Sequence, residues 1–187
     1  MMPISTDENR ISHIIFLHGP SSSGKSTIAQ TLQARLPQPF WHISIDHLRD
    51  SGVLPSARYK SGEFDWTADR NAFFNGFHNA IAAFANAGNA LILEHILDED
   101  DWLADLQRSL KRHDVMFVGV YCDLPEMIAR EAARGDRPIG SAEADFNRVH
   151  FGKRYDLKVQ SEHGVDYNVD QIIDFWRRPV RRSDFAR

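Results

Sequence analysis

The sequence predicts a single α/β domain in which helices cover both faces of a mostly parallel five-stranded sheet, a three-layer α/β/α arrangement. Short apolar runs alternate along the chain with segments of helical periodicity, and this alternation is typical of right-handed strand–helix–strand units. The first apolar run leads directly into a turn rich in glycine and serine. The chain of 187 residues is long enough for one sizeable core. We therefore assign residues 1–187 to one domain, with 1–12 as an N-terminal extension.

Two strands and one helix are expected at the start of the chain. Residues 14–17 are mostly β-branched and aromatic, which favours a buried strand. Residues 27–36 carry apolar side chains at helical spacing, and Pro37 ends this helix. A second strand covers residues 41–45 and leads into Asp46.

The middle of the chain predicts two further helices and two further strands. Residues 67–87 are rich in alanine and place phenylalanines at helical intervals, and a glycine follows them. The apolar residues 90–93 form the third expected strand, which leads into Glu94. A helix is expected over residues 99–112 and a strongly apolar fourth strand over 115–121.

The last part of the chain predicts a helix, a fifth strand and a final helix. The helix over residues 125–134 begins with a proline, which suits a first helical turn. The strand is expected over 156–159 and the final helix over 169–176. Ligands of parallel sheets bind beyond the carboxyl ends of the strands. That rule singles out Gly19, Asp46, Glu94 and the segment after Tyr121.

Composition narrows the classes of partner. The net charge of -4 gives the protein no general attraction for nucleic acid, so nucleic acid is an unlikely partner. No apolar run approaches the roughly 20 residues of a membrane helix. The N-terminus does not resemble a secretory signal. Cys122 is the only cysteine, which excludes an internal disulfide and suits the cytoplasm. We expect Cys122 to be a small buried hydrophobe. No pattern specifies an oligomeric state.

Residues 19–26 match the phosphate-binding pattern G-x-x-x-x-G-K-[ST], the P-loop or Walker A motif, between a predicted strand and a predicted helix. In such a loop, glycines let successive backbone N–H groups converge on phosphate oxygens, and the following helix adds its positive end. A lysine bridges the β- and γ-phosphates, and a serine hydroxyl joins the Mg²⁺ shell. The residues expected to hold the nucleotide are Gly19, Pro20, Ser21, Ser22, Ser23, Gly24, Lys25, Ser26 and Thr27. The motif thus predicts binding of a nucleoside triphosphate, ATP or GTP, with Mg²⁺.

Two acidic residues at expected strand ends are candidates for chemistry. Asp46 is placed to accept a proton from a hydroxyl of a bound acceptor, or alternatively to cap a short following helix. Glu94 is placed to order Mg²⁺ together with Ser26, or alternatively is a satisfied strand-end carboxylate. His95 beside it is less specific, because a lone histidine is more often structural.

Three arginines follow the fourth strand. Arg130 and Arg134 lie one helical turn apart and share a face, and Arg137 follows a glycine that frees the chain to fold over a nucleotide. These guanidiniums suit bidentate phosphate contacts in a helical lid, in which Arg130 would hold the nucleotide. Alternatively they belong to a solvated helix face paired with Glu126, Glu131 and Asp136.

Several segments match one known pattern together. They are the loop from Gly19, the strand-end Asp46, the strand over 118–123, the run Arg-Glu-Ala-Ala-Arg-Gly-Asp-Arg over 130–137, and His150 with Tyr155-Asp156. In these segments the chain resembles the chloramphenicol phosphotransferase-like family of P-loop kinases. The resemblance extends from about residue 14 to 155 and beyond, and the run over 130–137 is far more specific than the phosphate loop alone.

The resemblance implies a P-loop NTPase fold and transfer of the ATP γ-phosphate to a hydroxyl of a small molecule, an antibiotic or a metabolite. It places Asp46 as the acceptor base, and Arg134 and Arg137 as stabilisers of the transferring phosphoryl group, beside Lys25, which the motif places on the β- and γ-phosphates. Where two adjacent acidic residues are expected after the third strand, this chain has Glu94 and His95. The resemblance also implies a role in antibiotic resistance.

The segment over residues 54–66 does not match the family pattern, and we expect acceptor specificity to lie there. Its charged and aromatic residues either contact the acceptor or form an irregular loop packed over the core; they are Arg58, Tyr59, Lys60, Phe64 and Trp66. Residues 177–187 form a basic tail, expected to be solvated and disordered, with an anionic partner as the alternative. Two other functions stay open: a nucleotide-dependent switch that transfers no phosphate, and a toxin-like kinase acting on a nucleotide sugar or RNA.

Overall fold

The computed structural model describes residues 11–134 and 140–186, and it contains the five-stranded sheet that the sequence predicts. The strands are β1 (His13–His18), β2 (Trp41–Ser44), β3 (Leu91–Glu94), β4 (Asp114–Tyr121) and β5 (Leu157–Gln160). They lie in the order β2-β3-β1-β4-β5, and each neighbouring pair is parallel. Strand β1 therefore occupies the centre of the sheet, so the loop that follows it opens at the middle of the carboxyl edge.

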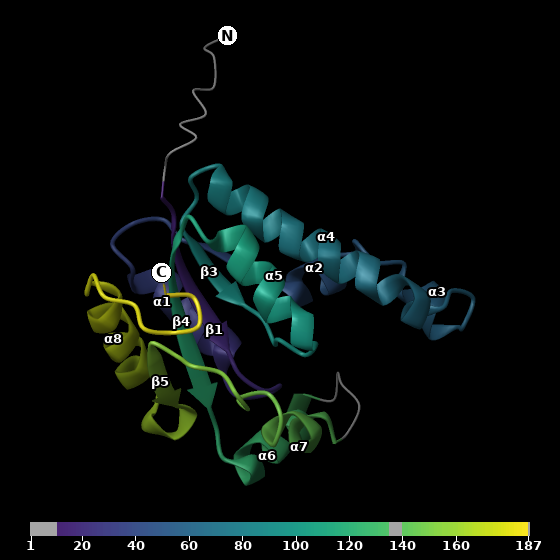
Figure 1. The fold of residues 1–187 in the computed structure, drawn as a ribbon. Helices are drawn as coiled ribbons and strands as arrows, with labels where there is room; N and C mark the ends of the chain where they lie inside the picture. The colour runs from purple at the N-terminus through teal and green to yellow at the C-terminus, as the bar shows by residue number, and fades with distance from the viewer. Residues whose placement is uncertain (1–10, 135–139, 187) are drawn as a thin grey trace.

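Helices cover both faces of this sheet (Figure 1). They are α1 (Lys25–Arg35), α2 (Ile45–Asp50), α3 (Ser56–Lys60), α4 (Trp66–Asn86), α5 (Asp100–Leu110), α6 (Leu124–Arg134), α7 (Ser141–Phe146) and α8 (Val165–Trp176), with a short 3-10 turn, η1, over Ser161–His163. None of the helices in the described part of the chain is long and apolar enough to cross a membrane.

Alternate side chains of β1 enter two separate cores, because successive residues of a strand point to opposite faces. Ile15 and Leu17 pack with α1 and α8 on one face, whereas Ile14 and Phe16 pack with α4 and α5 on the other. All four side chains are almost completely buried. The three-layer α/β/α prediction is confirmed, and burial on both faces explains why β1 is apolar along most of its length.

The structure corrects the boundary at the end of the second strand. The prediction extended this strand to Ile45 and placed Asp46 at its end, but β2 ends at Ser44 and α2 begins at once. The Ser44 side chain accepts a hydrogen bond from the Asp46 N–H over 3.2 Å. Ser44 is therefore the N-cap of α2, and Asp46 lies in the first helical turn.

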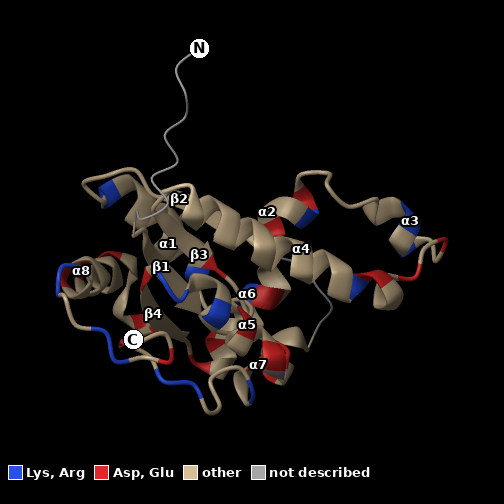
Figure 2. Cartoon of the chain, turned by 45° about the horizontal axis from the view of Figure 1, so that its top comes forward, with Lys and Arg blue, Asp and Glu red and all other residues tan. Residues whose placement is uncertain are grey.

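Helix α3 arises in the segment over residues 54–66, for which the sequence predicts no regular structure. It lies beside the N-terminal end of α4, away from the sheet (Figure 2). The ring of Tyr59 meets that of Trp66, with centroids 5.4 Å apart, and its hydroxyl donates to Asp69 over 2.9 Å. These contacts fold the segment into a compact arm on α4.

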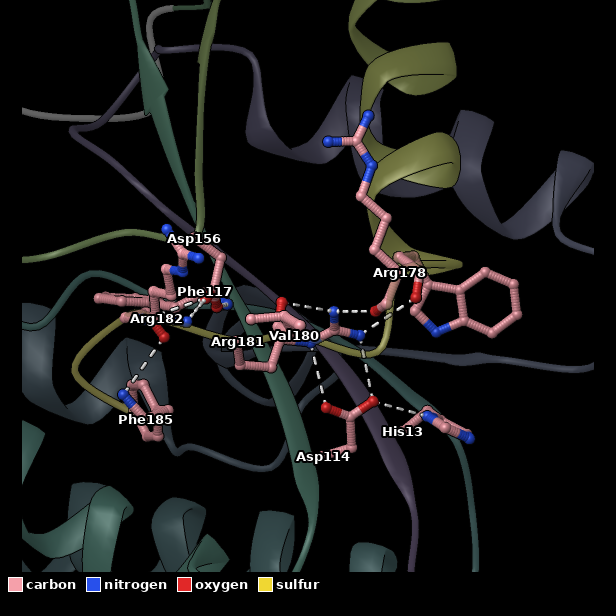
Figure 3. Close-up of polar contacts among 11 residues, drawn as sticks. His13, Asp114, Phe117, Asp156, Arg178, Val180, Arg181, Arg182 and Phe185 are labelled. Carbon is pink, nitrogen blue, oxygen red and sulfur yellow. Dashed lines mark hydrogen bonds and ion pairs between the residues drawn. The ribbon is translucent and has the colours of Figure 1, made fainter. Parts of the chain in front are cut away.

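The predicted disorder of the tail is wrong for residues 177–186, although residues 177–180 and Arg182 are exposed, as expected of a solvated tail. The Arg181 side chain is only 9% exposed and forms an ion pair with Asp114, whose Oδ1 lies 3.1 Å from Nε (Figure 3). Farther on, the Phe185 ring lies 5.6 Å from that of Phe16 and 5.1 Å from that of Phe117, centroid to centroid. The tail is anchored because it supplies an aromatic ring to the α4/α5 core and a counter-charge to Asp114.

Candidate active site

The phosphate loop connects β1 to α1 at the centre of the sheet. Gly24 has a φ of 91° and is the N-cap of α1, a left-handed conformation that favours glycine. A Cβ at Gly19 would lie 2.3 Å from the carbonyl oxygen of Val120, so only glycine fits where β1 leaves β4. The two motif glycines thus meet specific steric demands, and the loop wraps over the start of α1, where helix N–H groups point outward.

Lys25 lies within the curl of this loop. Its side chain is buried, and Nζ donates to the carbonyl oxygen of Pro20 over 2.6 Å. The hydroxyl of Ser23 is completely buried and has no hydrogen-bond partner among the described residues. The loop therefore concentrates a positive charge and unused hydrogen-bonding capacity at one point, as an anion site requires.

Ser26 and Glu94, the two residues expected at Mg²⁺, are hydrogen-bonded to each other. The Ser26 hydroxyl donates to Oε1 of Glu94 over 2.7 Å, and Nε2 of His42 lies 3.1 Å from Oε2. Burial opposes ionisation of Glu94, but the hydrogen bond from His42, the charge of Lys25 and the hydrogen bond from Ser26 outweigh it, so the pKa of this carboxyl is lowered.

This pair fits a Mg²⁺ ion shared with a nucleotide. An ionised carboxylate and a hydroxyl beside the phosphate loop are hard oxygen ligands of the kind Mg²⁺ takes. In the described ranges, no group of three or more His, Cys, Asp or Glu side chains could hold a metal ion. The arrangement therefore suits an ion whose remaining ligands are phosphate oxygens and water, rather than a cage made of protein side chains.

Asp46 lines the same cavity as the phosphate loop. This cavity has a volume of about 830 Å³, and its lining includes Lys25, Ser26, Asp46, Arg70, Phe74, Glu94, His95, Trp102, Arg130 and Asp145. Asp46 forms an ion pair with Arg49 on the same helix, with Oδ1 and Nη1 3.0 Å apart. The side chain keeps 24% of its exposure, so solvent and ligand can reach the carboxylate.

Part of the cavity wall combines aromatic rings with the guanidinium of Arg70. Arg70 of α4 lies over the rings of Phe74 and Trp102, at 4.9 and 5.0 Å from their centroids. Its guanidinium also pairs with Asp98 over 2.9 Å and with Glu99 over 2.6 Å. The positive charge of Arg70 is thus already balanced by carboxylates of the segment that follows β3.

His95 belongs to this aromatic wall. Its ring stacks on Trp102 at 5.3 Å, and its Nε2 lies 3.0 Å from Nε2 of His78. Burial, followed by the neighbouring charges of His78, Lys25 and Arg70, holds the pKa of His95 well below its usual range. His95 is therefore a neutral group of the wall where the family pattern led us to expect an acidic one.

A smaller pocket of about 340 Å³ adjoins the cavity and shares Arg49, Arg70 and Phe74 with it. Of the five charged and aromatic residues singled out in the 54–66 segment, Tyr59, Lys60 and Trp66 line this pocket. The other two pack on each other, with the Arg58 guanidinium 3.7 Å from the centroid of the Phe64 ring. Three of these residues thus line a pocket beside the cavity and two pack on each other, and contact with the acceptor stays a prediction.

Arg130 lies beside the phosphate loop. Its Nη1 donates to the Ser161 hydroxyl over 2.9 Å and to the Ser22 carbonyl over 3.4 Å, while Nε pairs with Glu126 over 3.0 Å. Glu131 is buried and accepts backbone N–H bonds from Gly140 and Ala142, each 2.9 Å long. The Arg134 side chain, Asp136 and Arg137 lie outside the described residues.

Sequence reasoning missed several residues of the site. His42 does not line the cavity but contacts Glu94, and its signal was that of a polar residue within a short predicted strand. Arg70 and Asp145 gave no such signal in the sequence, because a charged residue within a helix is most often simply exposed to solvent. Their positions depend on contacts between segments far apart in the chain, which periodicity does not encode.

The central phosphate loop, the parallel order of the strands and the acidic groups at their carboxyl ends define a P-loop protein of the kinase type. Comparison with family profiles makes this assignment specific. The chain belongs to the family described as chloramphenicol phosphotransferase-like protein, whose profile matches residues 12–176. No curated protein matches the sequence.

Solved structures share the fold at low sequence identity. The APS kinase of Mycobacterium tuberculosis, in complex with AMPPNP and APS, has a TM-score of 0.66 and 17% identity over 90% of this chain and 99% of its own. A gluconokinase from Sinorhizobium meliloti has a TM-score of 0.63 and 16% identity, covering 89% and 93%. The tunicamycin resistance protein of Deinococcus radiodurans has a TM-score of 0.60 and 19% identity, covering 87% and 94%. At these identities the likeness concerns the fold.

Proposed function

We propose that this protein transfers the γ-phosphate of ATP to a hydroxyl of a small molecule, an antibiotic or a metabolite. One observation carries the proposal: a single cavity joins the phosphate loop, with Lys25 and Ser26, to the carboxylate of Asp46. A nucleotide-dependent switch needs the loop alone, whereas a kinase needs a second group placed for an acceptor. Family membership supports the kinase.

Phosphoryl transfer depends mainly on positioning and charge neutralisation. The N–H groups of the loop, the Lys25 ammonium and the Arg130 guanidinium would bind the triphosphate. Ser26 and Glu94 would hold Mg²⁺, which when bound neutralises charge on the β- and γ-phosphates. We assign Arg134 and Arg137 to the transferring phosphoryl group on the family resemblance. GTP fits the same phosphate contacts.

Asp46 would act as the acceptor base. The acceptor hydroxyl oxygen forms a bond to the γ-phosphorus, the bond from that phosphorus to the β,γ-bridging oxygen breaks, and ADP leaves. The hydroxyl proton goes to the Asp46 carboxylate. The ion pair with Arg49 fixes the orientation of this carboxylate. Asp46 therefore performs the one step that requires a proton acceptor.

The charges around Asp46 favour an uncharged acceptor. Arg49 pairs with Asp46 and Asp50, and Arg70 pairs with Asp98 and Glu99, so carboxylates already balance both guanidiniums. The adjoining pocket presents mainly apolar and aromatic side chains, among them Leu54, Trp66 and Phe73, with Lys60 as its lysine. An acceptor with an apolar group beside its hydroxyl would fill this pocket.

The reaction is proposed for the reducing cytoplasm. Cys122 is buried, and burial, followed by the hydrogen bond to Glu162, raises the pKa of its thiol to about 11. Such a thiol is inert and forms no disulfide.

A transfer screen tests the proposal. The purified protein is incubated with γ-labelled ATP, Mg²⁺ and a panel of hydroxyl-bearing antibiotics and metabolites, both neutral and anionic. We expect label on at least one neutral acceptor with the wild-type protein and at least about 100-fold slower labelling with Asp46→Asn. Nucleotide binding without transfer to any member of a broad panel would favour the switch instead.

A further inference from the structure

The carboxylate of Asp145 lies against the phosphate loop. Its Oδ2 accepts a hydrogen bond from the backbone N–H of Ser21 over 3.0 Å, although 124 residues separate them. The Asp145 side chain is only 16% exposed and lines the same cavity as Lys25 and Asp46. The N–H groups of a P-loop are the donors that nucleotide phosphates use. An anionic oxygen of the protein therefore occupies a donor that a phosphate oxygen would require.

Neighbouring groups of the loop are satisfied by the protein in the same way. The Lys25 ammonium donates to the carbonyl of Pro20, and Arg130 donates to that of Ser22. These three groups of the loop therefore have internal partners, whereas the buried Ser23 hydroxyl has none among the described residues. The contact from Asp145 is the member of this set that carries negative charge, as a phosphate does.

The other carboxylate oxygen of Asp145 also has a charged neighbour. Its Oδ1 lies 4.0 Å from a guanidinium nitrogen of Arg148, one turn away. Arg148 in turn pairs with Asp98, and Asp98 pairs with Arg70 over 2.9 Å. A chain of alternating charges thus runs from the phosphate loop to the aromatic wall near Asp46. This chain makes the position of Asp145 part of a network rather than the chance orientation of a surface side chain.

We propose that Asp145 is a built-in competitor of the nucleotide: its carboxylate holds the Ser21 N–H until a triphosphate displaces it. This inference rests on the proposed nucleotide binding. A carboxylate and a phosphate oxygen cannot share one N–H donor, and their negative charges repel at contact distance. Displacement of Asp145 also releases the end of the charge chain that reaches Arg70, so the acceptor side of the cavity responds to the nucleotide.

Calorimetric binding measurements on the full chain test this inference. The probes are a non-hydrolysable ATP analogue, inorganic tripolyphosphate and adenosine, and the proteins are wild type, Asp145→Ala, Asp145→Asn and Glu143→Ala. We expect Asp145→Ala to bind the ATP analogue and tripolyphosphate about tenfold more tightly, because no carboxylate must leave. Adenosine, which lacks phosphate, should bind equally to all four proteins.

Glu143→Ala is the matched control, because Glu143 is an exposed residue of α7 with the same charge, and among the described residues no hydrogen bond or ion pair joins it to the phosphate loop. It should leave all affinities within about twofold. Asp145→Asn removes only the charge and decides the matter if Asp145→Ala does not fold.

Unchanged or weaker binding by both Asp145 variants would overturn the inference, as would equal tightening for adenosine. A wild-type protein and variants that bind no phosphate probe would instead refute the proposed function itself. Binding that appears only in the Asp145 variants would support the competitor strongly.

Discussion

The hydroxyl of Ser26 and the carboxylate of Glu94 meet over 2.7 Å, joining the first turn of α1 to the end of β3 across 68 residues of sequence. The parallel register of β1 and β3, which pairs Leu17 with Glu94, makes this meeting a direct consequence of the fold. The carboxylate is held ionised next to the phosphate loop, and this is the geometry on which the Mg²⁺ assignment depends.

Glu94→Gln should weaken Mg²⁺-dependent nucleotide binding about 10- to 100-fold, because an amide is a poor partner for the hydrated ion. Binding of the nucleotide without Mg²⁺ should be almost unchanged. Titration of ATP with and without Mg²⁺ measures both quantities. Glu143→Gln is the control, because it makes the same change at an exposed glutamate that lies far from β3 in the sequence. An equal loss in the presence and absence of Mg²⁺ would show that Glu94 only supports the loop.

Asp46→Asn should lower turnover by roughly 10²- to 10⁴-fold while leaving nucleotide affinity intact, because it removes the proton acceptor and little else. Asp50→Asn is the matched control: Asp50 also pairs with Arg49, but its side chain is 62% exposed. Steady-state transfer rates and calorimetric affinities separate the two effects. If Asp50→Asn impaired turnover as much as Asp46→Asn, the role would belong to Arg49 rather than to a base.

Stability should fall as the pH is lowered from about 6.5 towards 4. Burial lowers the pKa of His150 to about 4, and burial also lowers that of His18, which shares the Tyr155 hydroxyl with it. The unfolded chain, in which histidine titrates near 6.5, therefore binds more protons in this window. The stabilisation is complete above the unfolded pKa and is lost on acidification, by on the order of 1 kcal/mol per pH unit and histidine.

Urea unfolding between pH 7 and 5 measures this slope. His150→Gln should flatten it, whereas His163→Gln, at an exposed position, should leave it unchanged. Identical slopes for wild type and His150→Gln would mean that the pKa of His150 is the same in the folded and unfolded chains, which would contradict its lowering by burial.

Phe185→Ala should lower the free energy of unfolding by about 2 kcal/mol, because it removes a partly buried ring from the α4/α5 core. Val180→Ala, in the same tail but at a residue that is 53% exposed, should have almost no effect. Chemical denaturation measures both. No loss from Phe185→Ala would contradict the anchored tail. Truncation before Arg177 would test whether the basic tail binds an anionic partner. Because the tail is anchored, the truncation should also lower the free energy of unfolding.

The sheet and the phosphate loop were predictable because their signals are local. Residues 14–17 form an apolar run, and the glycines of the motif mark the turn that follows. The N-cap at Ser44 was also available, since a serine before a helix start is a known signal, and using it would have ended the second strand correctly.

The remaining features depend on contacts between distant segments. Phe185 is buried by Phe16 and Phe117, and a basic run gives no indication that one of its arginines will meet Asp114. Asp145 reaches Ser21 only because α7 folds back towards the phosphate loop. Neither arrangement leaves a periodic pattern in the sequence.

The affinity of the purified protein for Mg²⁺ and ATP, compared between wild type and Lys25→Ala, tests the account most directly. Lys25 contributes a buried ammonium to the loop, and its loss should weaken binding by at least about tenfold while the fold persists. Wild-type protein that binds no nucleotide, or a Lys25→Ala variant that binds as tightly as wild type, would contradict it.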